Sequence, residues 1–419
     1  MSRSSTARPL RGGTLPHLAD FNETIVLDAV RRSEDGCSRV ELAHLTGLSG
    51  QSITNIVRRL VERDLVREGG REAPAGVGKP RTILRLNPSG VHVVGVHLDP
   101  SAITYVMLDF HGRPVASLSH RTPSVTEVLP VLEEITAHVE RLIADSGVSR
   151  ESIIGVGIAS PGPVDVSAGI VLNPPLLPGW VNVPLRDHLQ EHTGLPTVLD
   201  KDVIAGAVAE QWAAGPRRSP DSAFIYVGTG IGVGLVLNGH VLRGASSNLG
   251  DIGLLPVSAI GEPDEQPRAF AALGAVASAH VVMRAAARRG ILPPDFGEVQ
   301  PAEAAAGFRV LRALADGGSA SARDMLEEMA HYLSSGIVTI TNMLDLDTVI
   351  LGGPIWQELA PYALPIVRPA VNRRAVPGQL HEVVVRGTTL GDNVTAIGAG
   401  CLVLDQRFSP RFAPTAVRA

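Results

Sequence analysis

Apolar residues near the start of the chain recur with helical spacing. In the stretch "SRVELAHLTGLSGQSITNIVRRLVERDLV", Ser38 and Glu41 form a capping-box pattern, which predicts a helix that runs through Leu45. Gly47 interrupts that helix, and Ser49 is placed to cap a second one. The second helix has apolar positions at i, i+3, i+4, i+7 and i+8, namely Ile53, Ile56, Val57, Leu60 and Val61. The preceding segment "FNETIVLDAVRRS" predicts a further helix, so three are expected.

Two short strand-like runs, "LVRE" and "RTILRL", flank the Gly/Pro-rich loop "GGREAPAGVGKP" and predict a wing. Three helices and a wing are typical of a winged helix-turn-helix, in which the helix after Ser49 enters the major groove. The side chains at its start would then contact base edges, and its arginines would contact phosphates. The predicted DNA-contact residues are Ser49, Gly50, Gln51, Ser52, Thr54, Asn55, Arg58, Arg59, Lys79 and Arg81. A small helical protein-interaction module is the alternative interpretation.

Lys79 and Arg81 belong to the segment "GVGKPR". A narrow, extended basic segment of this kind can enter an A·T-rich minor groove. A plain flexible linker has the same composition, so both interpretations remain open for this segment.

The rest of the chain contains one strand–turn plan twice. "HVVGVHLDPSAITYVMLDFHGRPV" has a hairpin turn at Gly112, and "SAFIYVGTGIGVGLVLNGHVLRG" has one at Asn238-Gly239, a strong hairpin signal. Helix-rich stretches follow each hairpin. The pattern predicts an internal duplication that forms two α/β lobes with a ligand-binding cleft between them. The expected domains are 1–86 (DNA-binding), 87–200 (first lobe) and 201–419 (second lobe).

Composition adds limits on location and chemistry. The chain of 419 residues has a net charge of −5, but residues 1–86 carry 14 Arg or Lys against 10 Asp or Glu. A basic N-terminal region followed by an acidic remainder is consistent with a nucleic-acid contact at the N-terminal end of the chain. No apolar run reaches membrane-spanning length, no secretion signal is visible, and Cys37 and Cys401 are the two cysteines. We therefore expect a cytoplasmic protein with no metal and no bound cofactor.

The order of motifs resembles the ROK family of sugar kinases and sugar-responsive repressors. The similar motifs are "SRVELAHLTGLS", "GKPRTILRLNPSG", "GIASPGPVD", "NPPLLPGWVNVPL", "LDKDVIAGAVAE", "GTGIGVGLVLNGHVLRG" and "VILGGPI". The resemblance implies an α/β fold in which an N-terminal winged helix-turn-helix precedes a two-lobed actin/hexokinase-like ATPase fold. It also implies that the C-terminal helix returns to the first lobe.

The family's first phosphate hairpin, Asp-x-Gly-Gly-Thr, is altered here. Asp99 remains, but Pro100, Ser101 and Ala102 follow it, and these residues lack the conformational freedom of glycine. The second phosphate motif is intact. The resemblance therefore implies a vestigial nucleotide site made of Asp99, Gly228, Thr229, Gly230, Gly232, Gly352 and Gly353.

The family's sugar site is altered as well. Asp202 aligns with the catalytic base, Lys201 replaces an Asn beside it, and we expect the lysine to lower the basicity of the carboxylate. "GDIGL" replaces Gly-Glu-Ile-Gly-His, and the cysteine-rich zinc loop that should follow has no Cys, which argues against zinc. The predicted effector (sugar) pocket comprises Asn173, Lys201, Asp202, Asp251, Leu254 and Gly274. The alternative is that the carboxylates are merely solvated or paired.

These features predict a DNA-binding transcriptional regulator of ROK type, a repressor that has lost kinase activity. It would bind double-stranded operator DNA with an inverted repeat as a homodimer or tetramer, and a sugar or related metabolite would act as effector. One alternative is an active ATP-dependent carbohydrate kinase with an appended DNA-binding head, with Asp202 as its catalytic base. Another is a regulator controlled by a protein partner, with a vestigial cleft.

Overall fold

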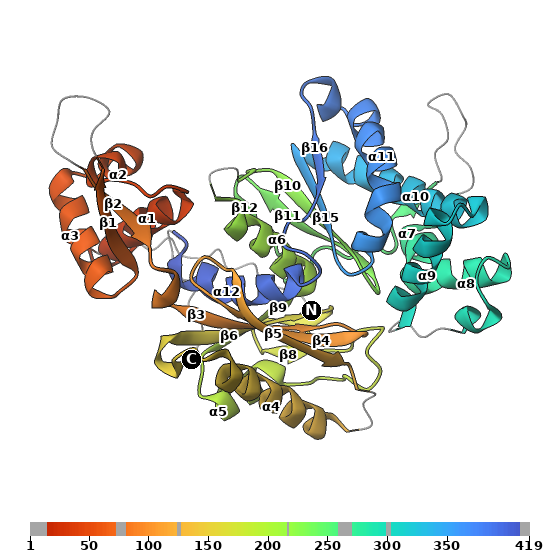
Figure 1. Ribbon diagram of the computed structural model, residues 1–419, viewed down its shortest axis with the longest axis horizontal. Coiled ribbons are helices and arrows are strands. Elements are labelled where there is room, and N and C mark those ends of the chain that lie inside the picture. The colour runs from red at the N-terminus through yellow and green to blue at the C-terminus, as the bar shows by residue number, and fades with distance from the viewer. Residues whose placement is uncertain are drawn as a thin grey trace, which may run out of the picture. The chain divides into compact units, whose positions relative to one another are not determined.

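The computed structural model describes residues 15–72, 81–123, 127–215, 218–258, 270–298 and 303–410 (Figure 1). The chain divides into two compact units. One comprises the residues up to Gly90 together with those from Gln406, and the other runs from Val91 to Asp405.

The first unit is a winged helix. It contains α1 (Leu15–Arg32), α2 (Arg39–Thr46), α3 (Gly50–Glu62), and the antiparallel strands β1 (Val66–Glu72) and β2 (Arg81–Leu86). The predicted capping box is confirmed, because the backbone N–H of Ser38 donates to Glu41 Oε2 at 2.8 Å and Glu41 N–H donates to Ser38 Oγ at 3.3 Å. Gly47 ends α2 in the left-handed region, at φ 70°. The three helices and the two wing strands form as the sequence predicts, but β1 continues to Glu72, through the first four residues of the segment predicted to be the wing loop.

Apolar side chains from all three helices and from the wing form the core of this unit: Val26, Val30, Leu42, Ile53, Val57, Leu60 and Leu84. Cys37 extends the wing, since its backbone exchanges two hydrogen bonds with Leu84 at 2.8 and 3.0 Å. Burial raises the pKa of the Cys37 thiol to about 11. The thiol therefore stays protonated and serves as packing.

The second unit contains two five-stranded sheets among its described residues. The first has the order β5-β4-β3-β6-β9, and the second has the order β12-β11-β10-β15-β16. Their strands are β3 (His92–Leu98), β4 (Ala102–Leu108), β5 (Pro114–Arg121), β6 (Ile153–Ser160) and β9 (Thr197–Lys201), then β10 (Ser222–Val227), β11 (Ile231–Leu237), β12 (His240–Val241), β15 (Thr348–Gly352) and β16 (Val384–Gly387). Two short pairs, β7 (Val164–Asp165) with β8 (Ile170–Val171) and β13 (Pro256–Val257) with β14 (Ala271–Ala272), are antiparallel.

The two sheets share one topology, as expected from an internal duplication. In each, the first strand along the chain lies at the centre, pairs antiparallel with the second strand and pairs parallel with the fourth. The predicted turns occupy equivalent places between the second and third strands, with φ 79° at Gly112, 52° at Asn238 and 74° at Gly239. Positive φ at both Asn238 and Gly239 is what a tight two-residue hairpin requires.

The helices of this unit are α4 (Val128–Ser146), α5 (Leu185–Thr193), α6 (Asp202–Ala213), α7 (Leu273–Ala277), α8 (Ala279–Arg288), α9 (Ala304–Asp316), α10 (Ala320–Leu344), α11 (Trp356–Arg374) and α12 (Val394–Phe408). The helices α4 and α5 cover the outer face of the first sheet (Figure 1). Buried residues of α8 to α11 form one apolar core with the second sheet.

Helices α6 and α12 lie between the two sheets, and glycines make this close stacking possible (Figure 1). A Cβ at Gly157 of β6 would lie 1.8 Å from the Ala399 carbonyl oxygen of α12. One at Gly398 of α12 would lie 2.0 Å from the Ala205 carbonyl oxygen of α6. The C-terminal helix is therefore in backbone contact with both the first sheet and α6. Within the described residues, no helix is long and apolar enough to cross a membrane.

Candidate DNA-binding helix and interlobe site

Helix α3 is strongly two-sided. Ile53, Ile56, Val57 and Leu60 are buried, and Gln51, Ser52, Thr54 and Asn55 are exposed on the other side. Val61, which the apolar pattern assigned to the buried stripe, is 36% exposed and lies at its margin. The stripe is thus narrower than the sequence pattern indicates, and the polar face is correspondingly wider.

Some polar residues of α3 stabilise the helix itself. Ser49 is the N-cap and accepts a hydrogen bond from Ser52 N–H at 3.2 Å, as the sequence predicts. Thr54 donates to the Gly50 carbonyl at 2.8 Å. The amides of Gln51 and Asn55, by contrast, have no hydrogen bond to another described residue. These two side chains are available to a ligand, and a carboxamide can pair in two places with adenine.

The arginines of α3 are already paired. Arg58 contacts Glu62 at 3.1 Å on the exposed surface, whereas Arg59 Nε donates to Glu23 of α1 at 3.0 Å. Glu23 also accepts from Arg63, so Arg59 helps to hold α3 against α1. Arg58, with its side chain 66% exposed, is therefore the more accessible of the two for a phosphate.

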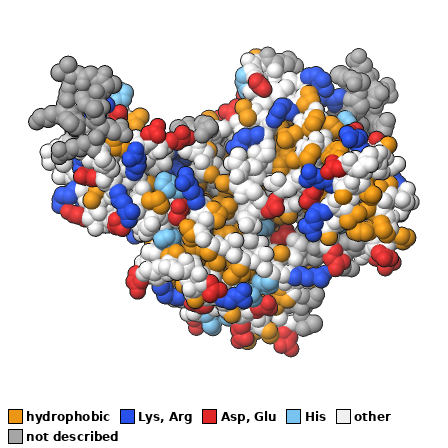
Figure 2. Space-filling model, viewed as in Figure 1, with side chains coloured by type: hydrophobic (Ala, Val, Ile, Leu, Met, Phe, Trp, Pro, Cys, Tyr) orange, Lys and Arg blue, Asp and Glu red, His pale blue; other side chains and the backbone are white. Residues whose placement is uncertain are grey.

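The segment predicted to enter a minor groove is only partly described. Lys79 lies outside the described residues. Arg81 begins β2 and pairs with Glu41 at 3.3 Å, with half of its side chain exposed. Figure 2 shows basic and acidic side chains interspersed over this unit on the face that it presents. Pairing of this kind means that phosphates would have to compete with carboxylates for the arginines.

In the second unit, hydrogen bonds from the protein itself occupy the Asp99 carboxylate. Its Oδ1 accepts from Ser101 N–H at 2.8 Å and from Thr229 Oγ1 at 3.1 Å, and its Oδ2 accepts from the Tyr226 hydroxyl at 3.1 Å. Ser101 Oγ donates to Oδ1 as well. Thr229 and Tyr226 come from the second lobe, so the two hairpins predicted to hold phosphate are bonded to each other.

Tyr226 also fills the space beside the glycines. A Cβ at Gly228 would lie 2.5 Å from its ring, and one at Gly353 would lie 3.1 Å from it. Burial, together with the nearby Asp99 carboxylate, raises the pKa of Tyr226, so the phenol stays neutral. The ring edge of His97 faces it, with the ring centroids 6.1 Å apart. Packing thus accounts for Gly228 and Gly353 without a nucleotide.

The other glycines of the predicted nucleotide site differ in their surroundings. A Cβ at Gly232 would meet Val203 at 2.6 Å, and one at Gly352 would meet Phe224 and Thr388 at 2.9 Å. Gly230 alone of these faces open space, with no described atom within 4 Å of an added Cβ.

Asp202 begins α6 and is half-buried beside the buried Lys201. Burial raises the pKa of Asp202 to about 6, with Asp99 adding to the rise, while Lys201 and the Val203 N–H act in the opposite direction. The lysine thus acts in the expected direction, since it lowers the pKa of Asp202, but the net pKa is raised. Desolvation of the carboxylate outweighs the nearby ammonium.

Lys201 itself is held in place by a contact between the lobes. Its Nζ donates to the Asn248 carbonyl at 3.3 Å. The Asn248 side chain forms two hydrogen bonds of 2.8 Å with the backbone of Val164, one to its N–H and one to its carbonyl. Asn248 thus joins a loop of the second lobe to strand β7 of the first.

The remaining predicted effector residues are brought only partly together. Asp251 forms a backbone bridge with Gly232, is exposed, and accepts from Gly253 N–H at 3.0 Å. Gly274 N–H donates to the Gly253 carbonyl at 2.8 Å, so Gly274 lies beside this turn. Leu254 is 86% exposed. Asn173 is also exposed, and its side chain has no hydrogen bond to a described residue.

Sequence reasoning missed three residues of the interlobe site: Tyr226, His97 and Asn248. His97 is buried, and its Nε2 has no hydrogen-bond partner among the described residues. Strand periodicity could have indicated that Tyr226 points to the same side as Gly228, but its contact with Asp99 depends on how the two lobes meet.

Comparisons with known proteins bear on both units. Residues 100–406 match the ROK family, and residues 20–74 match the MarR family. The chain belongs to the ROK family. Its fold is therefore the expected one, a winged helix-turn-helix followed by the ROK α/β fold.

Similar ROK proteins include repressors and kinases. The DNA-binding transcriptional repressor Mlc of Escherichia coli is 24% identical over 89% of this chain and 90% of its own length. The xylose repressor of Bacillus subtilis is 24% identical over 92% of this chain and 95% of its own length. The glucokinase of Halalkalibacterium halodurans is 28% identical over 75% of this chain and 96% of its own length.

Among solved structures, a ROK family transcriptional regulator described as a homologue of the E. coli MLC protein superimposes with a TM-score of 0.71. It is 21% identical and covers 94% of this chain and 98% of its own. A ROK glucokinase from Streptomyces griseus, solved with glucose and AMPPNP, gives a TM-score of 0.61 at 22% identity over 74% of this chain and 98% of its own. At these identities the structures support the fold alone.

Proposed function

We propose that this protein is a DNA-binding transcriptional regulator, a repressor that reads DNA with α3. The observation that carries the proposal is the exposed polar face of α3, a helix that Ser49 caps at its start. On this face the side-chain amides of Gln51 and Asn55 form no hydrogen bond with another described residue. The extent of the matches supports it. The repressors match about nine-tenths of this chain. The glucokinase matches 75% of it, which is about the share that remains when the winged helix is left out.

A single winged helix makes few base contacts, so we propose that the protein binds an inverted repeat as a homodimer. Two-fold symmetry places a second α3 in the next half-site, which doubles the contacts. A sugar or related metabolite near Lys201, Asp202 and Asp251 would alter how the lobes meet and thereby the spacing of the two winged helices.

We further propose that the protein has lost kinase activity because the part of the site that would hold phosphate has changed. Asp99 is held by Thr229, Tyr226 and Ser101, and Pro100 fixes φ where the family has a flexible turn. Because these three residues already donate to the Asp99 carboxylate, the groups around Asp99 do not fit a nucleotide phosphate. The family's zinc loop does not fit either, because its cysteines are absent from the sequence.

One observation favours the second candidate, an ATP-dependent carbohydrate kinase. The raised pKa of Asp202, about 6, is suited to a general base near neutral pH. The two candidates are separated by measuring Mg²⁺-dependent ADP release from ATP with a panel of hexoses and amino sugars. Turnover that disappears in Asp202→Asn would establish the kinase, and its absence in the wild-type protein supports the regulator.

DNA recognition is tested with an operator selected from a random pool and measured by fluorescence anisotropy. Asn55→Ala should relax the preference at one base pair by about 1–3 kcal/mol. Arg58→Ala should weaken all sequences alike and reduce the salt slope by about 1.

Arg141→Ala is a matched control for Arg58→Ala. Arg141 is 64% exposed and pairs with Asp145 at i+4, but it lies on α4 of the second unit. It should leave the affinity unchanged. If Asn55→Ala and Arg58→Ala both reduce specific and non-specific binding by equal factors, the proposed orientation of α3 is wrong.

The effector is tested by thermal-shift screening against sugars, sugar phosphates and ATP–Mg²⁺, followed by DNA release. A compound that stabilises the protein and releases DNA identifies a sensor. A protein that binds DNA yet responds to none of these compounds would instead point to control by a protein partner.

A further inference from the structure

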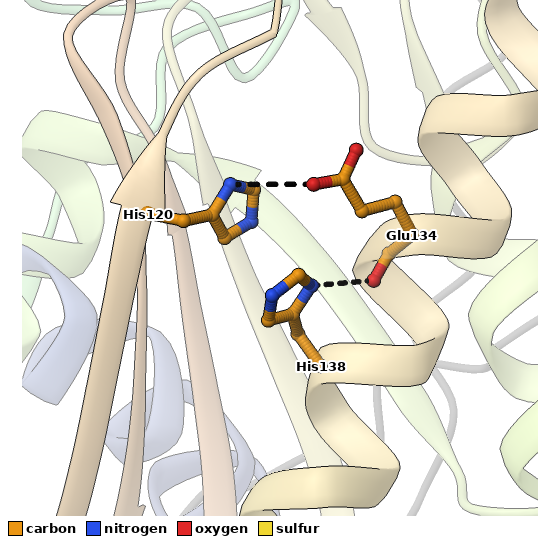
Figure 3. Close-up of side chains that lie close together, drawn as sticks. All are labelled: His120, Glu134 and His138. Atoms are coloured by element: carbon orange, nitrogen blue, oxygen red, sulfur yellow. Dashed lines mark hydrogen bonds and ion pairs between the residues drawn. The ribbon is translucent and has the colours of Figure 1, made fainter.

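Strand β5 and helix α4 bring two histidines and a glutamate together on the outer side of the first lobe. His120 of β5 faces Glu134 and His138 of α4 (Figure 3). One ligand atom from each residue lies within 4.8 Å of the others, and His120 Nδ1 is 3.6 Å from Glu134 Oε1. Glu134 and His138 are four residues apart, so they occupy one face of the helix.

The histidines are oriented by groups around them. His138 Nδ1 lies 2.8 Å from the Glu134 backbone carbonyl, which can only accept, so this nitrogen carries the proton and Nε2 keeps a free lone pair. His120 Nδ1 lies 3.0 Å from the Arg121 backbone carbonyl, and His120 Nε2 is 3.1 Å from the buried hydroxyl of Tyr105. A metal at Nδ1 would therefore displace the Arg121 carbonyl, and the ring proton would reside on Nε2, where it can donate to the Tyr105 hydroxyl. Hydrogen bonds of this kind, from the non-ligating nitrogen to a carbonyl or hydroxyl, usually fix the ring orientation of histidines that bind metals.

We propose that His120, Glu134 and His138 bind one divalent transition-metal ion of the Zn²⁺ type, with water in the fourth position. Two imidazoles and one carboxylate suit Zn²⁺, whereas Mg²⁺ and Ca²⁺ favour oxygen ligands throughout. The Glu134 side chain is 44% exposed, which leaves room for water and for entry of the ion. The site is separate from the interlobe residues and from the family's cysteine loop.

Binding requires a local rearrangement. The two imidazole rings are stacked with centroids 4.2 Å apart and planes 20° apart, but a metal lies in the plane of each ring that binds it. The rings must therefore tilt, and the ligand atoms must approach to about 3.3 Å, as tetrahedral bonds of about 2.0–2.1 Å dictate. Partial exposure of the three side chains permits movements of this size.

The ion would join the edge strand β5 to α4. Because the ligands are assembled only in the folded protein, binding should raise the melting temperature of the second unit. It would also fix the end of β5, where Arg121 pairs with Glu303 of the second lobe at 2.6 Å.

The test uses the full-length protein after EDTA treatment and dialysis. Isothermal titration with ZnCl₂ should show one site per chain, and Co²⁺ should give the intense visible absorption of tetrahedral coordination. His120→Gln and His138→Gln should each weaken binding at least about tenfold and remove the Zn²⁺-induced rise in melting temperature. Their far-UV circular dichroism and metal-free melting should match the wild-type protein.

The stacked pair His188 and His192 on α5, with ring centroids 4.0 Å apart, provides the control. His192→Gln should leave affinity and stoichiometry unchanged. Should a variant fold poorly, Glu134→Gln removes only the exposed carboxylate charge and should still weaken Zn²⁺ binding and shift the Co²⁺ spectrum. The proposal is overturned if Zn²⁺ does not bind, if it binds equally to the three site variants, or if His192→Gln abolishes it.

Discussion

Asp202→Asn should make the protein more stable at neutral pH. In the folded protein, burial raises the pKa of Asp202 to about 6 from 3.8. Between these two values the folded state holds a proton that the unfolded state has lost, so stability falls as pH rises through this window. Above pH 6 the folded protein carries a partly buried, ionised carboxylate, and an amide at this position avoids the cost of desolvating that charge.

The cost follows from the size of the shift. A rise of about two in the pKa of Asp202 corresponds to a loss of at most about 3 kcal/mol in the free energy of unfolding, at roughly 1.4 kcal/mol for each pKa unit. Because Asp202 is partly exposed, solvent screening reduces this, and we expect about 1–3 kcal/mol. For a unit of this size the melting temperature should rise by roughly 2–5 °C. The Asn oxygen can still accept from Val203 N–H, so the helix start is preserved.

The assay is thermal and urea unfolding of both proteins at pH 7.5 and pH 4. The gain should be full at pH 7.5 and small at pH 4, where the folded carboxyl is protonated and the unfolded one is only about half ionised, so that little of the cost has developed. Asp251→Asn, at an exposed carboxylate of the same site, is the matched control and should not stabilise the protein at pH 7.5. A gain that is equal at both pH values, or a loss at pH 7.5, would refute the argument.

Three other substitutions test separate parts of the structure. Gly157→Ala should destabilise the second unit by about 1–3 kcal/mol or more in urea unfolding, because its Cβ would collide with the Ala399 carbonyl; an unchanged midpoint would contradict that packing. Ser38→Ala should cost the winged helix about 1–2 kcal/mol in the same assay by removing the cap of α2, and a cost below about 0.3 kcal/mol would make the cap dispensable. Tyr226→Phe should cost about 1–3 kcal/mol by leaving Asp99 Oδ2 without its donor, whereas equal stability would show that the hydrogen bond adds nothing.

The features that the sequence predicted well depend on neighbours a few residues away. The Ser38–Glu41 capping box, the Ser49 cap and the Asn238-Gly239 turn are local devices, and each forms where it was expected. The repeated strand order also follows from a repeated pattern along the chain. Backbone hydrogen bonds and φ preferences act over short separations, so a single sequence determines them.

Other features depend on distances that no local pattern specifies. The Tyr226–Asp99 bond joins residues 127 positions apart, and the His120–His138 stack joins a strand to a helix. The pKa of Asp202 is raised rather than lowered because burial in the assembled unit exceeds the effect of the adjacent lysine. The sequence by itself determined the elements, their order and the residue types at each site. Only the tertiary structure decided which side chains meet and how far water is excluded, because desolvation and contact between distant segments arise from packing.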